Sequence, residues 1–170
     1  MNHLLLSIHV VAGIVFVGGS AVAASLFPRY APLLTGGGEP VRAVAGMAGD
    51  RPNAATDVKA SRERSRAVAV ALHRVTGGYA LLGLVVPVVG IALAVVQDRM
   101  GEIWITLAMV LTAAAGLLLA TQIHPRQRDA LDRPDDGRKL RTLAAITGVY
   151  NLVWTAVVVL MIVRPGSVAA

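Results

Sequence analysis

The chain has 170 residues, of which 55% are hydrophobic and only 15% are charged. With a mean hydropathy of +0.65, it is too apolar for an ordinary soluble domain. The net charge is +6, but the cations lie between apolar runs, as in membrane proteins, so we do not expect nucleic-acid binding. The absence of cysteine excludes disulfides, thiolate metal sites and cysteine nucleophiles.

Four apolar runs follow one another along the chain. They cover residues 4–26, 76–96, 103–123 and 142–163. Each run contains 21 to 23 residues and no Asp, Glu, Lys or Arg. As a helix rising about 1.5 Å per residue, each can cross the roughly 30 Å of a hydrocarbon core. Because backbone groups in lipid must bond internally, the sequence predicts an all-α transmembrane four-helix bundle, with residues 1–170 forming a single membrane domain.

The first run contains Ala21-Val22-Ala23, a sequence that resembles a signal-peptide cleavage site. No Lys or Arg precedes it, so the basic region of a signal peptide is missing. We therefore predict that the first run is a membrane helix.

The positions of the cations predict the orientation of the chain. Eight of the sixteen lie between the first and second runs, six lie between the third and fourth, and the other two are Arg99 and Arg164. Because Lys and Arg accumulate in cytoplasmic loops, residues 28–75 and 125–141 should be cytoplasmic. Both termini should then lie on the outer side of the plasma membrane of a bacterium.

The first cytoplasmic loop changes character at Ala54. Before this residue it contains Gly36-Gly37-Gly38 and other turn-forming residues. From Ala54 to Thr76 it is rich in alanine and charged residues and contains neither Pro nor Gly. We predict that this stretch is a helical extension of the second membrane helix, whose arginines would anchor it at anionic headgroups.

The two halves of the chain share a pattern. Each has a Pro-Arg pair after its first run, at Pro28 and Pro125, followed by a basic loop. The second run of each half then opens on a Thr-Gly-x-Tyr sequence, at residues 76–79 and 147–150. The pattern predicts two duplicated helical hairpins related by an axis along the membrane normal. Convergence of residues that are common at membrane interfaces is the alternative.

Few side chains near the runs could bind a cofactor. His73 and His124 lie at the cytoplasmic ends of the second and third runs, which are consecutive and antiparallel. Two histidines at one depth could ligate a haem b; alternatively, they cap helix ends or meet lipid headgroups. His9 is a third candidate haem ligand, but it lies near the outer surface and cannot share a small site with the other two. No metal-ion site is predicted.

Asn151 lies in the middle of the fourth run and needs a partner, so we predict a structural hydrogen bond between helices. The runs contain no carboxylate that could relay protons or bind Na⁺ or K⁺, and no arginine ladder. The chain has no HExxH motif and no Ser/His/Asp arrangement. We therefore predict no catalytic residue and do not expect an autonomous pump, channel or hydrolase.

The opening of the chain resembles known families. Residues 5–13 (Leu-Leu-Ser-Ile-His-Val-Val-Ala-Gly), Gly18-Gly19 and Phe27-Pro28-Arg29-Tyr30 are similar to a group of small bacterial membrane proteins of unknown function, and more distantly to the HemJ and CopD families. The spacing from His9 to Pro28 is longer than in HemJ by roughly one helical turn. The resemblance covers only the first helix. It implies a membrane bundle of four or more helices and, through HemJ, an association with haem b and protoporphyrinogen oxidation.

Three hypotheses for the function follow. The first is a non-enzymatic small subunit or accessory of a larger membrane assembly, in contact with lipid and with another membrane protein or a second copy of itself. The second is a haem b-binding redox protein, either a HemJ-like oxidase or an electron carrier. The third is a metal-transport accessory like CopD, for which the chain lacks a Met- or His-rich acceptor motif.

Overall fold

The computed structural model describes residues 2–33, 54–96 and 102–165, with the backbone alone for residues 2–10, 54–55 and 83–96. Within these residues the structure is helical and has no strand. Its elements are α1 (Asn2–Tyr30), α3 (Ala54–Val96), α4 (Ile103–Leu118), the π-helical turn η1 (Leu119–Ile123), α5 (His124–Asp132) and α6 (Arg138–Val163). The prediction of an all-α chain is confirmed.

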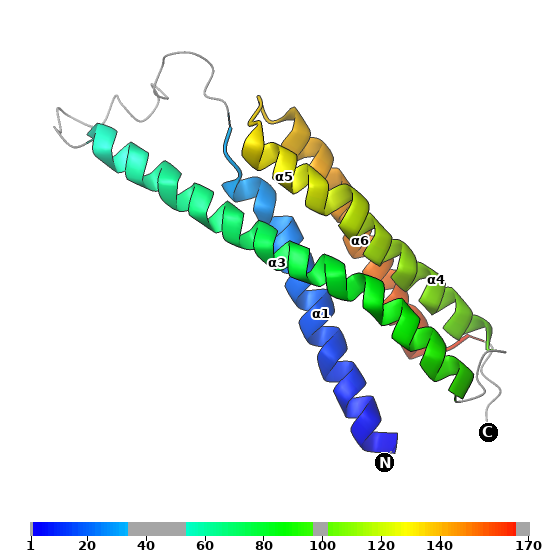
Figure 1. The fold of residues 1–170 in the computed structure, drawn as a ribbon. Helices are drawn as coiled ribbons and strands as arrows, with labels where there is room; N and C mark the ends of the chain where they lie inside the picture. The colour runs from blue at the N-terminus through cyan, green and yellow to red at the C-terminus, as the bar shows by residue number, and fades with distance from the viewer. Residues whose placement is uncertain (1, 34–53, 97–101, 166–170) are drawn as a thin grey trace.

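The helices form four rods that run up and down in chain order (Figure 1). The first rod is α1, the second is α3, the third consists of α4, η1 and α5 joined end to end, and the fourth is α6. The first and third rods each pack against the second and the fourth, so the rods close into a ring. The start of α1 and the end of α6 lie at one end of the molecule, and α5 lies at the other (Figure 1).

Three of the rods are long and apolar enough to cross a membrane. They comprise residues 11–30 of α1, the rod from Ile103 to Asp132, whose apolar part ends at Ile123, and α6. The predicted run at 76–96 forms the C-terminal half of α3; most of its side chains lie outside the described part of the chain. These helices are compatible with an integral membrane protein.

The described side chains sort as they do in a membrane bundle. Ala108, Ala115 and Gly116 are buried on α4, where small residues let neighbouring helices approach closely. Large apolar side chains such as Leu117 and Leu152 are exposed instead. In water so much exposed apolar surface would promote association, whereas in lipid it needs no cover.

Two helices do not end where the apolar runs end. α1 continues through Pro28 to Tyr30, and Ala31 N–H still donates to the Phe27 carbonyl at 3.0 Å. The third rod continues past Pro125 to Asp132. A proline removes one helical hydrogen bond, but neither proline ends its helix here, so both helices extend beyond the apolar runs.

Three polar contacts tie α3 and α6 to α1. The Tyr79 hydroxyl of α3 donates to the Val15 carbonyl at 3.3 Å. On α6, the Tyr150 hydroxyl donates to Ser20 Oγ at 2.7 Å. Asn151 Nδ2 donates to Ser25 Oγ at 3.0 Å, which is the kind of interhelical hydrogen bond that its mid-membrane position predicts. These hydrogen bonds add to the packing of α3 and α6 against α1.

Candidate functional site

The candidate site lies at the α5 end of the bundle, where His73 of α3 meets His124, the first residue of α5. His124 follows the π-helical turn η1, and its N–H donates to the carbonyl of Leu119, five residues earlier. The next residue is Pro125, which cannot make the ordinary helical hydrogen bond. The wider π turn accommodates this proline. Single π turns within α-helices are rare and frequent at functional sites.

The two imidazole rings are stacked. Their centroids lie 4.4 Å apart and their planes differ by 14°. His73 Nδ1 lies 3.3 Å from Gln127 Oε1, a pair that forms a hydrogen bond in the tautomer with the proton on this nitrogen. The Gln127 side chain is fully buried, and its Nε2 has no hydrogen-bond partner among the described residues.

A glycine makes room for the second ring. A Cβ added at Gly77 would lie 2.9 Å from His124 Nε2, whereas one added at Gly78 would meet nothing within 4 Å. Any other residue at position 77 would therefore force the His124 ring to shift. The position of the His124 ring therefore explains the glycine at position 77, whereas it does not explain the glycine at position 78.

The stacked rings do not fit a haem between them. Two axial histidines must lie on opposite faces of the porphyrin, each with a ring nitrogen directed at the iron. Here the rings face one another at 4.4 Å, which leaves no space for a porphyrin plane. The prediction that His73 and His124 act as haem ligands therefore finds no support in this geometry.

The other predicted ligand, His9, belongs to the start of α1, at the opposite end of the bundle from α5 (Figure 1). Its side chain lies outside the described residues. Within the described part of the chain, no group of three His, Cys, Asp or Glu side chains is placed to hold a metal ion.

Ion pairs surround the site on α5 and at the start of α6. Lys139 Nζ donates to Asp129 Oδ2 at 2.8 Å, and Arg133 Nε lies 3.9 Å from the other oxygen of the same carboxylate. Arg128 Nε lies 3.7 Å from Asp132 Oδ2. The hydrogen bond from Lys139 lowers the pKa of Asp129, and the charges of Lys139 and Arg133 act in the same direction. Exposed pairs of this kind contribute little to stability, but they leave both carboxylates of α5 engaged.

The sequence indicated the two histidines but missed their supporting residues. Gln127 follows His124 by three residues, a spacing that places both side chains on one face of a helix. Gly77 follows His73 by four residues and lies on the same face of α3. Helical spacing from each histidine could have found both, although the stacking of the rings depends on η1, for which the sequence gives no signal beyond Pro125.

Compared with protein-family models, curated proteins and solved structures, the chain matches none.

Proposed function

We propose that the chain is a non-enzymatic subunit of a larger membrane assembly and that it contacts a partner protein through the N-terminal part of α3. The observation that carries the proposal is the arm, defined here as residues 56–67. All of its side chains are exposed except Ser65, which is half-buried. Figure 1 shows this part of α3 projecting away from the other rods.

Three cations form a stripe along the arm. Lys59, Arg62 and Arg66 are spaced by three and four residues, so they lie on one side of the helix. The same side continues at Ala69, which is fully buried in the bundle. Arg64 lies on the opposite side, two residues from each of its arginine neighbours. The core-facing side of α3 therefore becomes a basic surface once the helix leaves the bundle.

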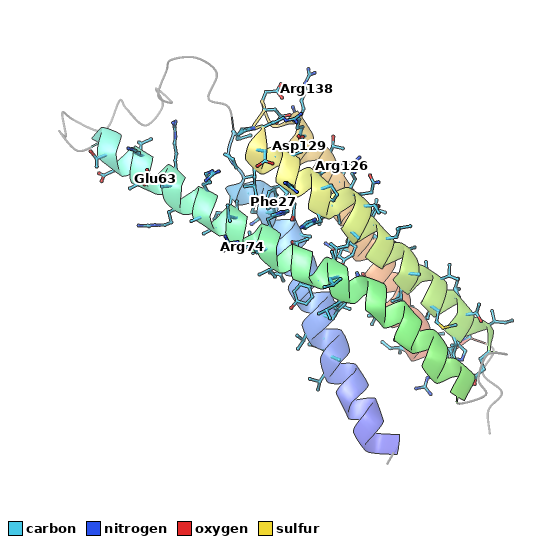
Figure 2. All side chains as sticks on the ribbon, viewed as in Figure 1. Phe27, Glu63, Arg74, Arg126, Asp129 and Arg138 are labelled. Atoms are coloured by element: carbon cyan, nitrogen blue, oxygen red, sulfur yellow. The ribbon has the colours of Figure 1, made fainter. Side chains whose placement is uncertain are left out.

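The stripe extends too far to serve lipid headgroups alone. Arg74 lies where α3 meets the bundle, and Glu63 lies well out on the arm (Figure 2). Arg62 is twelve residues from Arg74, or about 18 Å along the helix. A tilt of about 40° would still leave roughly 14 Å of height, compared with a headgroup layer of about 5–8 Å on each side. An acidic protein surface suits Lys59 and Arg62 better than headgroups do, and Arg66 is close enough to reach either.

In this proposal residues 28–75 and 125–141 are cytoplasmic and both termini are outside, because the cations concentrate in these two loops. The plasma membrane of a bacterium is the corresponding location. The up-and-down ring of rods is compatible with two duplicated hairpins. The repeated tyrosines, however, both donate to α1, so any duplicated halves have since diverged. The likeness to HemJ and CopD ends at Tyr30 and includes no residue of the arm.

The proposal predicts that Arg62→Glu disrupts the assembly while Arg64→Glu preserves it. A reversed charge in the stripe would repel an acidic partner, whereas the same change on the other side of the arm leaves the contact intact. The measurement is quantitative co-purification from native membranes in mild detergent, comparing both variants with the unaltered chain. Since contacts between exposed charges are screened by salt, raising the ionic strength should release the same partner.

Two results would contradict this proposal. One is recovery of the same partners at the same levels with both variants. The other is a chain that runs alone in every case, with an arm that protease cuts freely in native membranes. If Arg62→Glu changed only the binding of the chain to vesicles of anionic lipid, the arm would be a headgroup anchor.

A further inference from the structure

We propose that the stacked pair of His73 and His124 is a proton-sensitive latch that sets the position of the arm. The inference rests on the proposed function in one respect, namely that a movement of the arm changes its contact with the partner protein. The movement itself concerns α3 and α5 alone. The pair is the contact between α3 and the third rod that lies nearest the arm among the ring contacts of these helices.

The geometry allows neutral rings to stack and penalises two charged ones. With both rings protonated, two like charges would face each other with centroids 4.4 Å apart. Burial, the neighbouring His73 and Arg128 lower the pKa of His124 in the stacked arrangement, so acidification favours an arrangement in which the rings are apart. Gln127 Oε1 already accepts from His73 Nδ1 and has no counter-charge to offer.

The surroundings do not neutralise the added charge. The residues with charged side chains at this end of each packed helix are mostly cations, and all of these are exposed: Arg29 on α1, Arg74 on α3, Arg126 and Arg128 on α5, and Arg141 on α6. Arg128 is close enough to act on His124 electrostatically. The two carboxylates of α5 are engaged by Lys139, Arg133 and Arg128. A second proton therefore favours separation of the rings.

The local structure allows the two imidazole rings to separate. Neither ring is deeply buried. The His124 ring is held over Gly77 without covalent or ionic restraint, and η1 precedes it in the same rod. Ser61 is twelve residues from His73 on one continuous helix, or about 18 Å. A small change of angle at the pair is therefore amplified at the arm.

The test measures the distance between the arm and α6 at two pH values. The chain has no cysteine, so Ser61→Cys with Arg141→Cys provides two exposed sites for spin labels without background. We expect the distance distribution to shift by a few ångströms between about pH 8 and pH 5.5, a range in which histidines titrate and ordinary carboxylates do not. His124→Gln should abolish the shift, and His124→Arg should produce the low-pH distribution at pH 8.

Identical distributions at both pH values would overturn the proposal. So would a shift that survives in His124→Gln, because it would come from His3, His9 or another group. If His124→Gln fails to fold by circular dichroism, His73→Gln replaces it, with the same two outcomes. Loss of the shift with the Arg62-dependent partner contact intact would reject the latch and keep the docking role of the arm. A pH-dependent shift in a chain that binds no partner through Arg62 would keep the latch and reject the docking role of the arm.

Discussion

Gly19→Ala should destabilise the bundle by about 1–3 kcal/mol, the usual cost of overpacking, whereas Gly18→Ala should not. A Cβ at Gly19 would lie 2.9 Å from Cε2 of Tyr79 and closer still to its Cζ and hydroxyl. A Cβ at Gly18 would meet nothing within 4 Å. To make room, the Tyr79 ring would have to leave its hydrogen bond to the Val15 carbonyl and its edge contact with Phe16.

The neighbouring glycine makes this a matched experiment. Both substitutions add one methyl group to the same helix, and alanine is intrinsically the better helix former by about 0.5–1 kcal/mol. Thermal unfolding in detergent should therefore place Gly18→Ala at or above the unaltered chain and Gly19→Ala clearly below it. Equal stability of the two variants would mean that α3 does not pack on α1 through Tyr79.

Tyr150→Ala should cost about 3 kcal/mol, the low end of the range for truncating a buried aromatic residue. We expect the low end because helices in lipid gain no hydrophobic driving force from packing against each other. The cost of the substitution is then mainly that of the cavity it leaves. Tyr150 is fully buried and contacts the edge of the Trp154 ring at a centroid distance of 6.4 Å. Its hydroxyl joins α6 to Ser20 of α1.

Two further variants separate the ring from its hydroxyl. Tyr150→Phe keeps the ring and loses one interhelical hydrogen bond, which in membrane proteins averages about 0.6 kcal/mol. Ser20 Oγ would still donate to the Val17 carbonyl at 3.2 Å. Leu152→Ala, on the exposed side of α6, is the control and should leave unfolding unchanged. If Tyr150→Phe were as damaging as Tyr150→Ala, the hydrogen bond rather than the packing would hold α6 on α1.

Hydropathy and charge predicted the rods better than they predicted where the helices stop. The all-α architecture followed from the length of the apolar runs, because a span of that length in lipid has to be helical. The ends of the helices did not follow, because Pro28 and Pro125 looked like exits. Whether a helix continues past a proline depends on local adjustments, such as the π turn before Pro125, which sequence spacing does not reveal.

The candidate site was partly predictable for a similar reason. Antiparallel connection of the second and third runs implied that His73 and His124 lie at one depth. The orientation of the rings depends on the absence of a Cβ at Gly77 and on the rotation that η1 gives His124. Both depend on tertiary packing. They decide whether the two histidines stack or adopt an arrangement that could hold a haem. The shared Thr-Gly-x-Tyr pattern gave no indication that both tyrosine hydroxyls donate to α1.

The account depends most on the arm being in the cytoplasm and the end of α6 being outside. Single cysteines at Ser61, Asp135 and Arg164 in this cysteine-free chain report on the arm, the second basic loop and the residue that follows α6. With a membrane-impermeant thiol reagent on intact cells, we expect labelling at Arg164→Cys alone and labelling of all three after the cells are opened. Labelling of Ser61→Cys or Asp135→Cys in intact cells would contradict the orientation and the cytoplasmic docking role with it.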